Sequence, residues 1–322
     1  MTACPCCHHS ESRFFGTLGD RLFRTTPKKF DLYECRRCGV VFLSPSPQET
    51  ELAAYYPCGY WWQTTAGPVR FGFWHKALET YRRWLISGQV RRIARLVAKS
   101  SSRPVRLLDV GCGDGLFLAA CERMPCLRLG IDQSFPAAAM ARARGSMEAA
   151  QGRVDVLPFA SGSVDLVTMF HVLEHLARPQ ECLQEVRRVL NADGVFVAQV
   201  PNSASLQRRL FGRRWAGFDV PRHLVNYSSA SLRNLLESNG FHVMHMSYFS
   251  WRDNPAIPIM SLFPRLYPPA RRLWNSTSKG SSASDSLLDL AFLLLVLLAS
   301  PLAFGESLVG RGGTVIAVAQ RV

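Results

Sequence analysis

A glycine-rich turn between two apolar segments places the strongest constraint on this chain. Residues 107–118 read LLDVGCGDGLFL: an apolar run ends in an acid, passes through three glycines and continues with apolar residues at helical spacing. This pattern predicts a buried strand that enters a helix through a tight loop. Glycine lets a ligand approach the backbone closely, and the free N–H groups of a helix N-terminus can bind a carboxylate. We therefore expect a ligand site at this loop.

Strands and helices alternate after residue 106, which is typical of a doubly wound parallel sheet in an α/β protein. The predicted strands are 107–110, 127–131, 154–156, 164–170, 195–200, 241–248 and 314–320. The predicted helices are 116–123, 137–143, 180–190 and 229–239. The expected fold is thus a seven-stranded Rossmann-like sheet.

Changes in composition divide the chain further. The prolines at positions 45, 47 and 57 indicate a boundary after a small first unit. The expected organisation is a zinc ribbon-like module at 1–45, an aromatic and basic helical linker at 46–104, the core at 105–250, an apolar helical insertion with basic flanks at 251–312, and the final core strand at 313–322.

The first unit carries two cysteine pairs of metal-binding spacing. Cys4 and Cys7 form one CxxC pair, and Cys35 and Cys38 form the other. Four thiolates in this arrangement can surround one structural Zn²⁺ tetrahedrally. Cys6, His8 and His9 are further donors, so the register of the first pair stays open. The N-terminus has no apolar signal core, so we expect a reducing, cytoplasmic setting in which the cysteines are thiols or metal ligands.

The chain is strongly basic, with a formal net charge of +14. Basic residues concentrate in 70–106 and again after residue 250, at Arg252, Arg265, Arg271, Arg272 and Lys279. Such charge favours nucleic acid, anionic lipid or phosphate-bearing partners, unless it is only a solvated surface.

Two segments precede the glycine-rich loop. The aromatic cluster at 55–62 either covers a ligand or docks the small module, and we favour docking. Residues 73–98 carry apolar residues at helical spacing and predict one or two amphipathic helices.

The carboxyl ends of the predicted strands indicate a nucleoside site. Ligands of doubly wound sheets bind at this edge, where Asp109, the glycine loop and Asp132 all fall. An acid that follows the loop by about 20 residues can accept hydrogen bonds from both ribose hydroxyls. The loop reads Gly-x-Gly-x-Gly and lacks the longer fingerprint of dinucleotide sites, which suits a ligand without phosphates.

These segments resemble class I S-adenosylmethionine-dependent methyltransferases. The likeness rests on 109–115, on 130–132, on 157–159 before 164–167, and on 188–190 before Gly194; it covers 105–250 and returns at 314–322. The segments FHVLEHL at 170–176, Pro201-Asn202 and PRHL at 221–224 are similar to bacterial methyltransferases with an N-terminal CxxC module, often linked to surface-polysaccharide or secondary-metabolite pathways, and to the ubiquinone-biosynthesis O-methyltransferase group.

The resemblance implies a set of contacts to S-adenosylmethionine. The glycine loop and the acid before it would border the methionine half, and Asp132 would hold the ribose. Arg153 stands where the family often has an acid near the adenine, so we expect an adenine contact from the backbone of Val154 instead. The expected cofactor-binding residues are Asp109, Gly111, Cys112, Gly113, Asp132, Gln133, Val154 and Phe170.

Candidate catalytic groups follow the strand at 164–170. Methyl transfer needs alignment and exclusion of water, and a hydroxyl acceptor also benefits from a general base or a Lewis acid. His171, Glu174 and His175 lie at the active edge, and His223 comes from a later loop. Three readings stay open: a divalent ion such as Mg²⁺, a metal-free base at His171 or His223, or histidines that only brace loops. Some related methyltransferases place metal ligands at such a Glu-His pair plus a later His, with an acid where His171 stands.

A run of about 18 apolar residues at 287–304 has the length of a transmembrane helix. The final strand must return to the same sheet as the strand before it, so we expect a helix that enters one leaflet, not one that crosses the bilayer. A helix buried against the protein or a dimer partner is the alternative.

The sequence thus predicts an S-adenosylmethionine-dependent methyltransferase, peripheral on the inner face of a bacterial membrane. O-methylation of a small-molecule, sugar or lipid-linked substrate is favoured, with C- and N-methylation open. The rival interpretations are an RNA methyltransferase and a nucleic-acid-binding protein with a degenerate methyltransferase domain.

Overall fold

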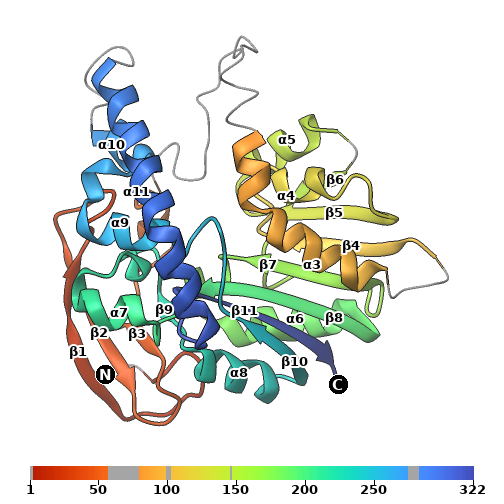
Figure 1. The fold of residues 1–322 in the computed structure, drawn as a ribbon. Coiled ribbons are helices and arrows are strands. Elements are labelled where there is room, and N and C mark those ends of the chain that lie inside the picture. Colours follow the sequence, from red (N-terminus) through yellow and green to blue (C-terminus); the bar gives the residue numbers. More distant parts are fainter. Residues whose placement is uncertain (1–2, 57–79, 99–102, 146, 275–282) are drawn as a thin grey trace.

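A computed structural model describes residues 3–56, 80–98, 103–145, 147–274 and 283–322. It contains a seven-stranded sheet and a four-stranded sheet, with a helical insertion beside them (Figure 1). The large sheet has the order β10-β11-β8-β7-β4-β5-β6. Its strands are β4 (Val105–Val110), β5 (Cys126–Asp132), β6 (Glu148–Gln151), β7 (Val164–Phe170), β8 (Leu190–Pro201), β10 (Phe241–Ser247) and β11 (Thr314–Arg321).

Helices cover both faces of this sheet, because successive strand residues point to opposite sides. Leu107 of β4 packs with α3, α4 and α5, whereas Leu108 packs with α6 and α8. The helices are α3 (Ser87–Val97), α4 (Leu116–Ala120), α5 (Phe135–Ala143), α6 (Pro179–Val189) and α8 (Ser229–Ser238). The central strands β4, β7 and β8 are thus largely buried, and the predicted Rossmann-like architecture is confirmed.

One predicted strand is displaced. The third strand is Glu148–Gln151, which pairs with β5, and the segment predicted at 154–156 contributes only an isolated bridge between Arg153 and Val156. The prediction followed the apolar residues, but Val156 is 66% exposed. As an edge strand, β6 needs little apolar surface, and only Ala149 of its four residues is buried.

The N-terminal residues form a second sheet that extends into the core. β1 (Ser12–Gly19), β2 (Lys29–Cys35) and β3 (Val41–Leu43) are antiparallel, and β3 pairs with β9 (Val225–Asn226). The buried residues of β3 share one apolar cluster with the large sheet. The module predicted at 1–45 is therefore hydrogen-bonded to a strand of the segment predicted as the core.

The aromatic cluster predicted at 55–62 lies mostly outside the described residues, as do residues 73–79 of the predicted amphipathic helices. Tyr55, which follows α1 (Glu49–Ala54), is buried and packs edge-on against Phe30 at 5.8 Å. This contact packs the segment after α1 against the N-terminal module, which is the kind of contact that the docking interpretation expects. The neighbouring Tyr56 instead reaches the histidine cluster described below.

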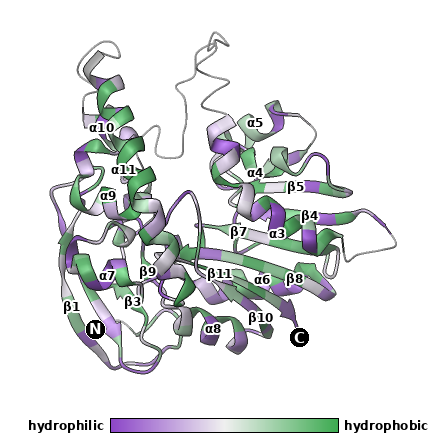
Figure 2. Ribbon diagram, viewed as in Figure 1, coloured by the Kyte–Doolittle hydropathy of each residue, from purple (hydrophilic) through white to green (hydrophobic). Residues whose placement is uncertain are grey.

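The insertion is helical. It contains α9 (Ala256–Leu262), η4 (Pro264–Leu266), α10 (Pro268–Trp274) and α11 (Ala283–Leu308). The remaining short helices are η1 (Leu173–His175), α7 (Leu206–Phe211), η2 (Gly212–Arg214) and η3 (Ala216–Phe218). Figure 2 shows α11 as a long, mainly hydrophobic helix beside the two sheets.

Candidate active site and metal-binding clusters

A cleft lies at the carboxyl ends of β4 and β7, beside the glycine-rich loop. Its lining includes five of the predicted cofactor residues: Asp109, Gly111, Cys112, Gly113 and Phe170. A Cβ atom at Gly111 would come within 2.4 Å of Val172, whereas one at Gly113 would meet nothing within 4 Å. Gly111 therefore allows close backbone packing, and Gly113 leaves open space for a ligand.

Asp109 is buried at the end of β4. Its carboxylate accepts a 2.7 Å hydrogen bond from the hydroxyl of Thr168 on β7. Burial raises the pKa of Asp109 to about 7, although the Thr168 bond opposes the rise. A cationic ligand would favour the ionised form of this carboxyl group.

Asp132 connects the end of β5 to the glycine loop. One carboxylate oxygen accepts from the Gly113 N–H at 2.9 Å, and the other accepts from the Ser134 N–H at 2.8 Å. These bonds fix the carboxylate while its remaining lone pairs stay available to ribose hydroxyls. The two carboxylates of Asp109 and Asp132 and the backbone of the glycine loop therefore offer the polar groups that S-adenosylmethionine needs.

The other predicted cofactor residues lie outside the cleft lining. Gln133 is exposed, and its carbonyl oxygen accepts from the Gln151 side chain. Val154 is partly buried against the main apolar cluster. Their predicted roles stay predictions.

His171 lies in an ionic network next to the cleft. It has a positive φ of 58°, and its ring nitrogens lie 3.1 Å from Glu174 and 3.1 Å from Asp253. Burial would lower the pKa of His171, but the two carboxylates outweigh it and raise the pKa to about 9. The role of His171 as a general base stays a prediction.

The sequence analysis missed the other members of this network. The Gln199 amide donates to Asp253 at 2.8 Å, and its oxygen accepts from Gln89, which lines the cleft. Asp253 follows β10 and belongs to the predicted insertion, so no local motif marks it. The polar Gln199 within the otherwise apolar β8 run was the one available signal.

Glu174, His175 and His223 form a second cluster, in which one donor atom from each lies within 4.8 Å of the others. Nδ1 of His175 lies 3.0 Å from the Arg222 carbonyl, and Nδ1 of His223 lies 2.8 Å from the Gly217 carbonyl. Because carbonyl oxygens only accept, both Nδ1 atoms carry protons, and in a neutral ring the lone pair is then on Nε2. Burial and the neighbouring His223 lower the pKa of His175 to about 4. Oε2 of the buried Glu174 has no hydrogen-bond partner among the described residues.

This cluster is braced by the N-terminal module. Arg222 is fully buried and forms ion pairs with Asp20 at 2.8 Å and with Asp219 at 2.7 Å. Its guanidinium also donates to the carbonyl of Tyr55, and the hydroxyl of Tyr56 contacts Nδ1 of His175 at 2.9 Å. The β1–β2 loop therefore helps to hold the backbone that orients the histidines.

The structure brings together the four predicted thiols of the N-terminal module. Cys4 and Cys38 lie 3.6 Å apart, Cys7 and Cys35 lie 3.5 Å apart, and all four sulfur atoms lie within 4.8 Å of one another. Zn–S bonds of 2.3 Å in a tetrahedron imply sulfur separations of about 3.8 Å. Cys6 instead points to the Tyr227 hydroxyl, so this geometry selects the pair Cys4 and Cys7.

Part of the basic segment before the glycine loop forms ion pairs within the protein. Arg82 pairs with Asp114, and Arg103 and Arg106 both pair with Asp165. These arginines hold the helix at 80–85 and the start of β4 in place. Arg83, Arg91 and Arg95 of the same segment are exposed, and an anionic partner for them stays a prediction.

A family model described as a methyltransferase domain matches residues 73–246. The chain belongs to this family of class I S-adenosylmethionine-dependent methyltransferases. A probable S-adenosylmethionine-dependent methyltransferase of Mycolicibacterium smegmatis is 31% identical over 153 residues, which are 46% of this chain and 56% of that protein. A counterpart from Mycobacterium tuberculosis is 33% identical over 153 residues, 46% of this chain and 52% of that protein.

The aligned region spans about half the length of these two relatives. Among solved structures, a SAM-dependent methyltransferase from Archaeoglobus fulgidus matches 78% of this chain and 100% of its own, with 18% identity and a TM-score of 0.48. The assignment rests on the family model and not on this score.

Proposed function

We propose that this methyltransferase O-methylates a small-molecule, sugar or lipid-linked acceptor at the cytoplasmic face of a membrane. The observation that carries the proposal is the exposed apolar face of α11. The acceptor chemistry is argued from the cluster of Glu174, His175 and His223.

The exposed face of α11 consists of leucines at helical spacing. Leu287, Leu294 and Leu298 are 67%, 51% and 75% exposed, and Leu302 is 80% exposed. The opposite face packs on the protein through Val296 and Ala303. Within the 24-residue segment Asp285–Leu308, a stretch of 18 residues has a mean hydropathy of 2.4, and 11% of that stretch is buried. A soluble surface helix carries charge at such positions, so these leucines favour contact with a lipid phase.

The packing of α11 favours a helix that lies along the surface. It contacts α9, η4 and α10, and it leads directly into β11 of the central sheet. Arg271, predicted as part of a basic flank toward lipid, is instead buried and paired with Asp285 and Asp289 of α11. That pairing neutralises the acids near the start of the helix.

The carboxylate and two histidines supply groups that could activate a hydroxyl acceptor. One ring nitrogen of each histidine and one Glu174 oxygen lie within 4.8 Å of one another, and Oε2 of Glu174 has no hydrogen-bond partner among the described residues. Together they can accept a proton or hold a divalent ion, which would lower the pKa of an acceptor hydroxyl. Two imidazoles and one carboxylate suit a transition metal better than the predicted Mg²⁺, which prefers oxygen ligands.

We further infer that the Cys4, Cys7, Cys35 and Cys38 cluster holds a structural Zn²⁺. Four thiolates complete a tetrahedral shell, which leaves no position for a substrate. The ion would order the two knuckles from which β1, β2 and β3 extend.

The proposal is tested with purified full-length protein and methyl-labelled S-adenosylmethionine. We expect saturable cofactor binding, co-sedimentation with phosphatidylcholine vesicles, and label in the organic phase of a lipid extract. Leu294→Glu/Leu298→Glu should abolish vesicle binding and retain cofactor binding. Leu127→Glu/Val156→Glu, which makes the same charge change at two exposed apolar positions elsewhere, is the control. A protein that stays wholly soluble at low salt without detergent would remove the membrane proposal, and label in RNA instead of lipid would replace the substrate class.

A further inference from the structure

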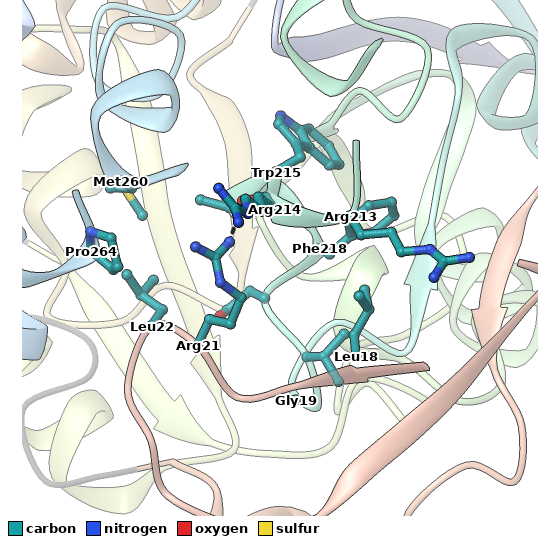
Figure 3. Close-up of a pocket in the computed structure, with 13 residues that line it drawn as sticks. Leu18, Gly19, Arg21, Leu22, Arg213, Arg214, Trp215, Phe218, Met260 and Pro264 are labelled. Atoms are coloured by element: carbon teal, nitrogen blue, oxygen red, sulfur yellow. Dashed lines mark hydrogen bonds between the residues drawn. The ribbon is translucent and has the colours of Figure 1, made fainter. Parts of the chain in front are cut away.

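A second pocket lies between the N-terminal module and the insertion, away from the cofactor cleft (Figure 3). We call it the Arg21–Arg214 pocket. Its wall comes from the β1–β2 loop, from the η2–η3 segment, and from α9 with the residue that begins η4. The lining residues used here are Leu18, Arg21, Leu22, Arg214, Met260 and Pro264.

The β1–β2 loop holds Arg21 in place. The neighbouring Asp20 accepts hydrogen bonds from the Phe23 and Thr25 N–H groups and is paired with the buried Arg222. Leu22 is buried against the insertion. The backbone on both sides of Arg21 is therefore fixed before any ligand binds.

Arg21 and Arg214 bring two positive charges together. The Arg21 guanidinium donates to the Arg214 carbonyl at 2.7 Å and to the Ser261 carbonyl at 3.5 Å. Burial and the adjacent positive charge of Arg214 lower the pKa of Arg21. Figure 3 shows both side chains directed to the same region, with Leu22, Met260 and Pro264 alongside.

These two arginines form no ion pair within the described chain. The carboxylate in the pocket wall belongs to Asp219, which is paired with Arg222. Two adjacent guanidinium groups that lack a carboxylate partner are suited to a phosphate group, which accepts several hydrogen bonds at once.

The apolar neighbours of the pocket indicate where the phosphate comes from. Leu262 and Phe263 lie between the wall residues Met260 and Pro264, and they are 55% and 49% exposed. α9 packs against α11, the helix with the exposed leucine face. An anion site bordered by exposed apolar side chains matches the interface of a bilayer, where phosphates lie directly above hydrocarbon.

We propose that the Arg21–Arg214 pocket binds the phosphate of an anionic lipid headgroup. The inference rests on the proposed membrane-face function and adds a lipid preference to it. α11 supplies binding to any lipid surface, whereas the pocket selects anionic membranes.

The experiment measures binding of the full-length protein to two kinds of vesicle, phosphatidylcholine alone and phosphatidylcholine with phosphatidylglycerol. We expect the wild type to bind both and to prefer the anionic vesicles at low salt. Arg21→Ala/Arg214→Ala should lose about tenfold or more of the affinity for anionic vesicles. It should keep its affinity for neutral vesicles and for S-adenosylmethionine.

Two further variants keep the test decisive. Arg123→Ala/Arg142→Ala removes the same charge from exposed positions after α4 and on α5, and it should retain the preference. Arg214→Ala alone keeps the main-chain carbonyl that Arg21 uses, so it covers the case in which the double variant misfolds.

Three outcomes would overturn the proposal that the pocket binds a lipid phosphate. The first is an unchanged preference in the arginine variants, and the second is an equal loss in the control. The third is inorganic phosphate that binds without lipid and abolishes the preference, which would make free phosphate the ligand. Binding to neither vesicle overturns the membrane proposal as well, whereas binding to both without a preference removes the pocket alone.

Discussion

The thiol cluster of the N-terminal module and the Glu174–His175–His223 cluster show two ways to gather donor groups. The thiols come in two CxxC pairs, each on a tight turn, and four donors close a tetrahedron. The second cluster takes two donors from η1 and one from a loop after η3, and it offers three donors. A closed shell of four thiolates is typical of structural metal sites, whereas three nitrogen and oxygen donors leave a position for a reactant.

The difference lies also in how each cluster is supported. The thiols are arranged by local turns: Gly39, for example, follows the second pair with a φ of 71°. The histidines depend on backbone carbonyls that distant residues hold in place, through Arg222 and its partner Asp20. We therefore expect that local substitutions disrupt the thiol cluster without affecting the rest of the protein. The Glu174–His175–His223 cluster should also be disrupted when remote contacts are lost.

Removal of one thiol should have the largest effect. Cys38→Ser should release the metal and unfold the N-terminal module, because structural zinc contributes on the order of 10 kcal/mol to small metal-binding units. Metal analysis should fall from one zinc per chain to none. Cys6→Ser is the matched control and should retain the zinc; loss of zinc there, with retention in Cys4→Ser, would show that the other register is used.

Loss of the remote ion pair should come next. Asp20→Ala leaves the buried Arg222 with one carboxylate fewer, and breaking a buried pair costs about 3–5 kcal/mol. We expect a clear fall in Tm and reduced methyl transfer, with the zinc content unchanged. Glu34→Ala removes an exposed ion pair with Arg13 and should change Tm little. Full activity in Asp20→Ala would show that the histidine cluster does not depend on the N-terminal module.

Substitution within the histidine cluster should affect chemistry more than stability. His223→Ala should lower kcat by about a hundredfold, which is the scale of a lost base or metal ligand. Cofactor affinity should stay within a factor of about two, because the cluster is not part of the cleft lining. His242→Ala, an exposed histidine on β10, is the control. If kcat is unchanged in His223→Ala, the cluster only braces the loops.

Asp109 lies in neither cluster, and its substitution should have the most specific effect, a change in the pH dependence of stability and of cofactor binding. Its pKa is about 7 in the fold and 3.8 in the reference state, so the folded protein holds a proton that the unfolded chain has lost. Stability should fall as pH rises from about 4 to 7 and then level off. Affinity for the cationic cofactor should rise toward pH 7, by at most about tenfold per pH unit.

Asp109→Asn should remove both pH dependences and bind the cofactor more weakly at pH 8. Calorimetry across this pH range measures both quantities. If the cofactor affinity of Asp109→Asn still changes with pH, another group causes that change. Asp132 is the first candidate, because burial raises its pKa too.

Local patterns explain why much of this molecule could be predicted. The strand at 164–170 and the loop at Asp109–Gly115 follow from short-range hydrophobic order and glycine spacing, and the paired cysteines follow from their separation. The same logic failed at 154–156, because an edge strand is defined by its partner and not by its own hydrophobicity.

Long-range contacts explain what the sequence left hidden. The pKa of His171 is set by Asp253, 82 residues further along, and the orientation of His175 depends on Arg222 and hence on Asp20. Neither acid stands in a recognisable motif. The HVLEH segment at 171–175 therefore predicted which residues gather, but not the protonation state of each.

The pairing of β3 with β9 also sets an order of events during synthesis. Phe42 must wait for Val225, which the ribosome adds 183 residues later. At bacterial or eukaryotic elongation rates this delay is roughly 10–40 s. Both cysteine pairs are complete by residue 38, so the proposed Zn²⁺ could bind during that interval. Until Val225 has been added, the nascent chain thus carries an N-terminal module with an unpaired strand edge at β3.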